Sequence, residues 1–282
     1  MGPGSSAYYG CALSAFMREW RATLKQPELP FLLVELAAYC NEHDSRTDRS
    51  WCDQNTSAIN TTDYDLPEMR IAQGRAAKGM GIYVETAADL GSVHPAHGSI
   101  HPVAKQELGA RLALAALAAA GDAEAVWEGP EAVAARHAAS GGAIEVEFNV
   151  SHGAGGVALN TTASCPSAMT ASPLGKLCCT GAGFELRIGG SGCCSGGVWV
   201  QPSSAALAPG KLNSIILTPA TESLVHGKPT RVRYAFVDWP VNSVRNQRSS
   251  GGSTTVPLPA RLFDMPICDG AVCPGGVCCT PL

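Results

Sequence analysis

The first third of the chain alternates between helix-like and strand-like patterns of apolar residues. Residues 8–25 place apolar side chains at helical spacing, whereas residues 29–40 form a continuous apolar run of the kind buried in a parallel sheet. A polar, turn-rich loop is expected over 41–65, followed by a helix over 66–79 and a strand over 80–90. This order is typical of βαβ units, so we expect an open, mostly parallel sheet with helices on both faces.

The last helix of this region has the strongest pattern. Pro102 suits the first helical position, because its missing N–H costs nothing there, and strong helix formers follow it as far as Gly121, the expected stop. Leucines at positions 108, 112, 114 and 117 fall on or near one face, which should pack on apolar neighbours. His101 then lies at the N-terminal end of this helix, where the helix dipole disfavours an imidazolium. A neutral imidazole at that place can accept a proton.

Around residue 122 the pattern changes to short alternating runs, which Gly and Pro interrupt at intervals typical of a β-sandwich. After a linker over 121–142, strands are expected within 143–150, 155–160, 183–190, 196–202, 213–219 and 230–240. The residues from about 244 onward are expected to be mostly loop. We therefore expect three parts: an α/β region over 1–121, a β-rich domain over 122–243, and a Cys-rich tail over 244–282.

Composition narrows the possible partners. The 282 residues are 45% hydrophobic, which is enough to fill the core of one large domain or two ordinary ones. There are 20 basic and 24 acidic side chains and no long basic run, so we expect no nucleic-acid partner. No segment approaches the length and apolarity of a membrane span.

Twelve cysteines, most of them in the second half, lie in Gly-rich, His-poor contexts without the paired spacing of a zinc site, so disulfides are favoured over metal. Glycosylation sequons favour the secretory route; they begin at Asn55, Asn60, Asn149 and Asn160. The first residues lack the charged start and apolar run of a signal peptide. We therefore expect a chain that begins partway through a longer protein, which is secreted or lysosomal in its full length.

Three histidines lie close together before the strongly patterned helix, at positions 94, 97 and 101. No Asp, Glu or Cys accompanies them at ligand spacing, so no metal site is expected.

The segment GSIHPVAKQELGARLALAALAAAG, followed by WEGP, resembles the distal catalytic segment of the sialate O-acetylesterases. These are SGNH/GDSL-like ester hydrolases, and the fold that the resemblance implies is a partial SGNH-like, flavodoxin-like sheet with a β-rich C-terminal region. Other stretches resemble the family in order and spacing: the helix ending in Trp20-Arg21 with its following strand, MRIAQ, IYVETAADLG, GSGCC, and RVRYAFVDWPVNSV through PLPARLFD. The resemblance covers nearly the whole chain and corresponds to the C-terminal portion of the family.

The resemblance implies hydrolysis of O-acetyl esters of sialic acid or of another acetylated glycan, without a metal or organic cofactor. A serine attacks the acetyl carbonyl, His101 takes the serine proton and later delivers it to the sugar oxygen, and Asn or Gly donors hold the oxyanion. The family's nucleophile turn and its Gln-Gly-Glu-Ser-Asn-like block have no counterpart in this sequence. Ser5 and Ser6, the nearest remnant, are not taken as the nucleophile. This polypeptide alone is therefore expected to be inactive.

The residue that orients His101 is left open by the sequence. Many SGNH enzymes carry an aspartate three residues before the histidine, where this chain has Gly98. Asp89, at the end of the preceding strand, is the candidate for that role, although an acidic residue there can also be a solvated or turn-stabilising group. Lys105 and Arg111 match the family's helix and are expected to be surface or packing residues.

Two further hypotheses remain beside the hydrolase. The chain is either a non-catalytic glycan-binding or interaction module derived from the family, or an incomplete reading frame whose serine lies upstream. For the binding module, the candidate contacts are Trp127, Trp199, Tyr234 and Trp239, each of which can instead fill the core.

Overall fold

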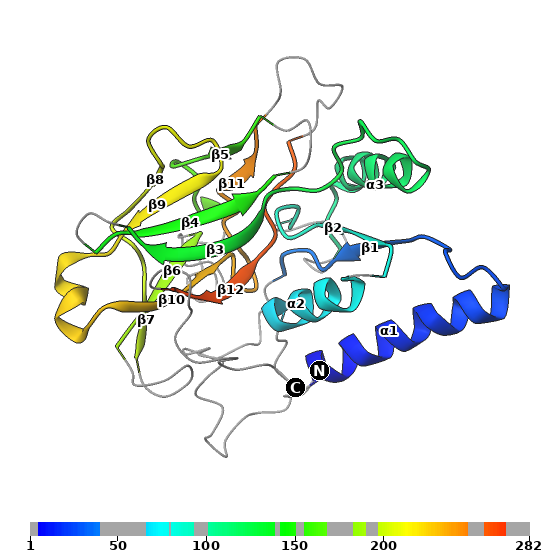
Figure 1. The fold of residues 1–282 in the computed structure, drawn as a ribbon, viewed down its shortest axis with the longest axis horizontal. Coiled ribbons are helices and arrows are strands. Elements are labelled where there is room, and N and C mark those ends of the chain that lie inside the picture. Colours follow the sequence, from blue (N-terminus) through cyan, green and yellow to red (C-terminus); the bar gives the residue numbers. More distant parts are fainter. Residues whose placement is uncertain are drawn as a thin grey trace.

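The computed structural model describes residues 5–39, 66–78, 80–92, 101–138, 142–150, 155–167, 183–189, 197–247 and 257–268 (Figure 1). The elements of the α/β region are α1 (Ser5–Leu24), β1 (Phe31–Glu35), α2 (Leu66–Ala77), β2 (Ile82–Thr86) and α3 (Lys105–Ala119). All five were expected from the apolar pattern. The predicted loop over 41–65 lies outside the described residues.

The two strands of this region pair in parallel, with Leu33 opposite Val84. Figure 1 shows α1 and α2 on one side of the pair and α3 on the other, which is the expected layered arrangement. Met17 of α1, Ala76 of α2 and Val84 of β2 are buried in a common apolar cluster. In the described part of the chain, however, the parallel sheet consists of these two strands alone. A complete SGNH-like sheet therefore remains a prediction.

Helix α2 is fixed to the end of β1 by two polar side chains. The fully buried Arg70 donates hydrogen bonds to the carbonyl oxygens of Leu36, Ala37, Val237 and Asp238, at 2.8–3.0 Å. Gln73 accepts a hydrogen bond from Leu36 N and donates one to Val34 O. These contacts satisfy backbone groups beyond the strand end and tie α2 both to β1 and to the β-rich part.

The start and the packing of α3 differ from the prediction. The helix begins at Lys105 instead of Pro102, and the Val103 N–H in the lead-in donates a hydrogen bond to Ser92 Oγ at 2.9 Å. Gly121 does follow its end, with φ of +97°. The residues of α3 that are buried are Arg111 and Ala115, while Leu117 is 49% exposed. The leucines of α3 therefore contribute less to its packing than the pattern predicts.

The β-rich part contains two four-stranded antiparallel sheets, in the orders β3-β4-β9-β8 and β12-β10-β6-β7, and a two-stranded sheet of β5 and β11. The bounds are β3 (Glu131–His137), β4 (Ile144–Asn149), β5 (Val157–Leu159), β6 (Phe184–Ile188), β7 (Val198–Val200), β8 (Ser204–Leu207), β9 (Ser214–Thr218), β10 (Pro229–Tyr234), β11 (Val244–Asn246) and β12 (Phe263–Pro266), with a 3-10 helix at Thr221–His226.

The two larger sheets share one apolar core. It includes Phe148 from β4, Leu186 from β6, Ile215 from β9 and Tyr234 from β10, all fully buried. The rings of Phe148 and Phe263 meet edge to face across the two sheets, with centroids 6.1 Å apart. This is the sandwich-like region that the alternating runs predict.

Four strands lie where the sequence predicts none. β3 falls in the expected linker and β8 between predicted strands; both are rich in alanine, which is depleted in strands. β11 and β12 fall in the expected tail, yet β11 pairs with β5 and β12 pairs with β10. The described residues after 243 thus contribute to the β-rich part, and the division of the chain into domains is otherwise a prediction.

The cysteine and sequon predictions are mostly outside the described residues. Cys11 is an exposed free thiol, and nine of the twelve cysteines lie in undescribed segments. Asn149 and Asn160 are exposed, whereas Asn55 and Asn60 are not described. Disulfides, glycosylation and the secretory route remain predictions.

One face of α1 and one strand carry apolar side chains without cover from the described residues. Phe16, Trp20 and Leu24, spaced by one helical turn, are each about half exposed, and Leu32 and Val34 on β1 are 37% exposed. Exposed apolar surface and an open strand edge favour association. We expect the wild-type chain to self-associate at micromolar concentration and the Phe16→Ser/Trp20→Ser variant to shift toward monomer in sedimentation velocity. Arg18→Ser, on the same helix, is the control, and a monodisperse wild-type monomer would contradict this expectation.

Candidate functional site

His101 lies in the lead-in to α3, four residues before the helix begins, and its side chain is exposed. Within the described residues, no hydrogen bond or ion pair restrains the ring. The imidazole is thus accessible to a ligand, as general acid–base chemistry requires. Residues 93–100, which include His94 and His97, are not described. The catalytic role of His101 stays a prediction.

Asp89 has a different set of partners. Its two carboxylate oxygens accept hydrogen bonds from Arg111, each at 2.7 Å, and one of them also accepts from Arg245 at 3.2 Å. The Asp89 side chain is 4% exposed and that of Arg111 is fully buried. The structure therefore places Asp89 in an ion pair that joins the end of β2 to α3 and β11. Among the described residues, no hydrogen bond or ion pair joins Asp89 to His101, and the role of Asp89 in orienting His101 stays a prediction.

Arg111 is consequently a packing residue, one of the two roles expected for it, and not a surface residue. It also donates to Thr86 O at 2.8 Å and to Glu107 at 2.7 Å. Burial lowers the pKa of Arg111, but hydrogen bonds and charge from Asp89 and Glu107 outweigh burial and raise it overall. Lys105, the other residue that matches the family's helix, is exposed.

Both parallel strands carry a buried glutamate near their carboxyl ends, and neither residue is among the site residues expected from the sequence. Glu35 is 1% exposed and Glu85 is 3% exposed. Burial raises the pKa of Glu85 to about 8; nearby Arg111 opposes this rise and Glu128 adds to it. Functional groups gather at the carboxyl ends of parallel strands. In the sequence, each glutamate lies within or near an apolar run, which does not show whether its carboxylate is buried.

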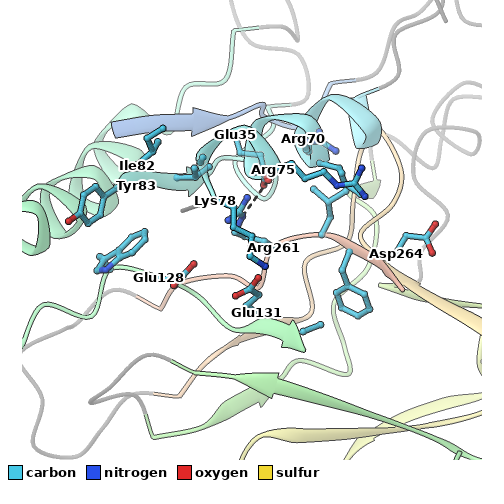
Figure 2. A pocket seen from close by; sticks show the side chains of 18 of the residues that line it. Glu35, Arg70, Arg75, Lys78, Ile82, Tyr83, Glu128, Glu131, Arg261 and Asp264 are labelled. Atoms are coloured by element: carbon cyan, nitrogen blue, oxygen red, sulfur yellow. Dashed lines mark ion pairs between the residues drawn. The ribbon is translucent and has the colours of Figure 1, made fainter. Parts of the chain in front are cut away.

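Glu35 also lines a cavity of about 490 Å³ between the α/β region and the β-rich part (Figure 2). α2 and β2 form one wall, and the segments around β3 and β12 form the other. Its charged and aromatic lining residues include Glu35, Arg75, Lys78, Tyr83, Trp127, Glu128, Glu131 and Arg261. His101 is not part of this lining. The cavity is therefore a second candidate site, separate from the histidine.

The four aromatic candidates for glycan contact fall into two groups. Tyr234 and Trp239 are buried and fill the core. Trp199 and Trp127 are half-buried; the Arg233 guanidinium covers the Trp199 ring at 4.1 Å, and Tyr83 meets Trp127 edge to face with centroids 4.8 Å apart. Trp127 alone among the four lines the cavity.

Among the described residues, no group of three or more His, Cys, Asp or Glu side chains is placed to hold a metal ion. No described helix is both long enough and apolar enough to cross a membrane.

The geometry thus defines a mixed α/β protein with an antiparallel β-rich part. Its fold is similar to the crystal structure of a carbohydrate acetylesterase from Xanthomonas citri, with a TM-score of 0.59 and 20% sequence identity. The match covers 92% of this chain and 46% of that structure, so the chain spans about half its length. No protein-family model matches the chain, and no curated protein matches it. The similarity establishes a shared fold.

Removing one partner of the Asp89–Arg111 pair should destabilise the fold. Arg111→Ala leaves a buried carboxylate with only Arg245 beside it, so we expect the free energy of unfolding to fall by about 3–5 kcal/mol. Lys105→Ala, on the exposed side of the same helix, should change it by less than about 0.5 kcal/mol. Chemical denaturation followed by circular dichroism measures both. Equal stabilities of the two variants would contradict a structural role for the pair.

The buried Glu85 should make the free energy of unfolding depend on pH. Because burial raises its pKa to about 8 in the folded state, the folded protein binds this proton more tightly than the unfolded chain does. Its contribution to stability is present below the unfolded pKa and is lost as the pH rises toward 8, by up to about 1.4 kcal/mol per pH unit.

Glu85→Gln should remove this part of the pH dependence, and Glu19→Gln, at an exposed position on α1, should keep it. The measurement is the free energy of unfolding at pH 5 and at pH 8.5. A wild-type pH dependence that survives unchanged in Glu85→Gln would show that Glu85 does not bind the proton.

Proposed function

We propose that the chain is part of a carboxylic-ester hydrolase that removes O-acetyl groups from carbohydrates, with His101 as the general base and acid. The observation that carries the proposal is the exposed imidazole in the lead-in to α3, to which no described residue is hydrogen-bonded, in a fold similar to that of a carbohydrate acetylesterase. The resemblance of the segment around His101 to sialate O-acetylesterases supports an O-acetylated sialic acid as the substrate.

In the proposed reaction, a serine oxygen attacks the acetyl carbonyl while His101 removes the serine proton. The tetrahedral intermediate collapses, the bond to the sugar oxygen breaks, and His101 returns the proton to that oxygen. Water then cleaves the acyl-serine by the same route, which releases acetate. No stretch of the sequence carries the nucleophile motif of the family that it resembles. We therefore propose that these 282 residues supply the acid–base part of the site and hydrolyse little ester alone.

The proposal predicts that an acetyl group binds against the His101 ring. In an NMR titration of the 282-residue chain, an O-acetylated methyl sialoside should shift the ring-proton signal of His101, which the His101→Ala variant assigns. The de-O-acetylated sialoside should shift it far less, and the other histidines provide internal controls. No shift at His101, or equal shifts with both sialosides, would overturn the proposal.

Hydrolysis of an aryl acetate completes this test. The wild-type chain and His101→Ala should release acetate at the same rate at equal protein concentration. A clear His101-dependent rate would support the hydrolase and overturn the inference that the nucleophile is missing.

The second candidate function is a non-catalytic glycan-binding module. The half-buried Trp127 favours it, because its ring lines a cavity where a ligand can reach it. Two results together would favour this candidate over the hydrolase. The wild-type chain would bind a glycan on an array, and no acetylated sugar would shift the NMR signal of His101.

A further inference from the structure

The cavity between the α/β region and the β-rich part is lined by an ion pair, Arg261 with Glu35, whose buried polar atoms are not all hydrogen-bonded among the described residues (Figure 2). Among the described residues, neither Glu35 Oε2 nor Arg261 Nε has a hydrogen-bond partner, although both atoms are buried. Arg261 Nε and Glu35 Oε1 form an ion pair at 3.6 Å, a distance too long for a hydrogen bond. A buried acceptor and a buried donor without partners each cost free energy.

The chain makes room for this arrangement. α2 carries a glycine at position 74, and a Cβ there would lie 2.0 Å from Arg261 Nη2. Figure 2 shows Arg261 between Glu35 on one side and Glu131 on the other. The side chain of Arg261 is 22% exposed and that of Glu35 is 1% exposed, so a ligand reaches Glu35 Oε2 only when side chains around it move.

The remaining lining groups limit the charge of a ligand. The lining carries four basic side chains, at positions 70, 75, 78 and 261, and four acidic ones, at positions 35, 128, 131 and 264, so its formal charges balance. Arg70 binds backbone carbonyls, and Asp264 binds Arg231 at 2.7 Å. An anion would meet the glutamates and a cation would meet the arginines and the lysine. A neutral ligand avoids both costs.

The polar and aromatic side chains of the lining indicate which kind of neutral ligand fits. A hydroxyl group both donates and accepts, so one hydroxyl can donate to Glu35 Oε2 and accept from Arg261 Nε. The Trp127 and Tyr83 rings supply apolar surface on which the C–H face of a ring can pack. The volume of about 490 Å³ falls within the usual range of small-molecule sites, about 300–1,000 Å³.

From these observations we infer that the cavity binds a neutral sugar ring, at a site separate from His101. The inference rests on the proposed function only in treating that sugar as part of the glycan that carries the ester. A neutral sugar in this cavity means that the substrate extends beyond the acetylated residue.

The test is a binding titration of the 282-residue chain by isothermal calorimetry, with the methyl glycosides of glucose, galactose and xylose as probes and methyl sialoside as the anionic comparison. At least one neutral glycoside should bind, and Trp127→Ala and Glu35→Gln should each weaken its binding by about tenfold or more. Tyr8→Ala and Glu19→Gln, which remove an aromatic ring and a carboxylate at exposed positions on α1, should leave it unchanged.

Thermal melting controls for folding, and Trp127→Phe, which retains an aromatic face, replaces Trp127→Ala if that variant does not fold. The inference is overturned if no neutral glycoside binds, if the cavity variants bind as the wild type does, or if methyl sialoside binds there equally well. Because this test measures binding at the cavity, it can fail while the acetyl-dependent shift of His101 is observed, and the reverse also holds.

Discussion

The buried ion pair of Asp89 and Arg111 is the interaction on which the rest of the candidate site depends. It joins the residue just after β2 to the middle of α3, and Arg245 of β11 extends it into the β-rich part. Such a pair adds little net stability because both charges lose their hydration, but removing one partner is costly. The pair therefore fixes geometry: it holds α3 on β2 and so sets where the lead-in with His101 can lie.

The fold was predictable wherever a segment carries its own pattern. α1, β1, α2 and β2 follow apolar runs with helical or continuous spacing, and β4, β6, β9 and β10 follow alternating runs. The missed strands depend on pairing partners distant in sequence. EAVAARH becomes β3 because β4 lies beside it, and β12 forms against β10 through Tyr234 and Phe263. Alanine-rich or Pro-flanked sequences give no local signal of such pairing.

The site was predictable in part. The sequence around His101 is specific enough to indicate a family that it resembles. The exposure of the His101 side chain agrees with a reactive role but does not test that role. The cavity could not have been found from the sequence, because Glu35, Trp127 and Arg261 come from a strand end, an apparent linker and an apparent loop. A charged residue inside an apolar run gives no sign of whether its carboxylate is buried. The two candidate sites are thus of different kinds, one found by motif and the other only by packing.

Hydrogen–deuterium exchange of the Asp89→Asn variant tests most directly whether this ion pair holds α3, and with it His101, in place. Asparagine keeps the shape of the side chain but removes the charge that Arg111 binds. The account predicts faster exchange of the α3 amides in this variant than in the wild type, with the exchange of β4, β9 and β10 unchanged. Exchange of α3 at the wild-type rate would contradict it.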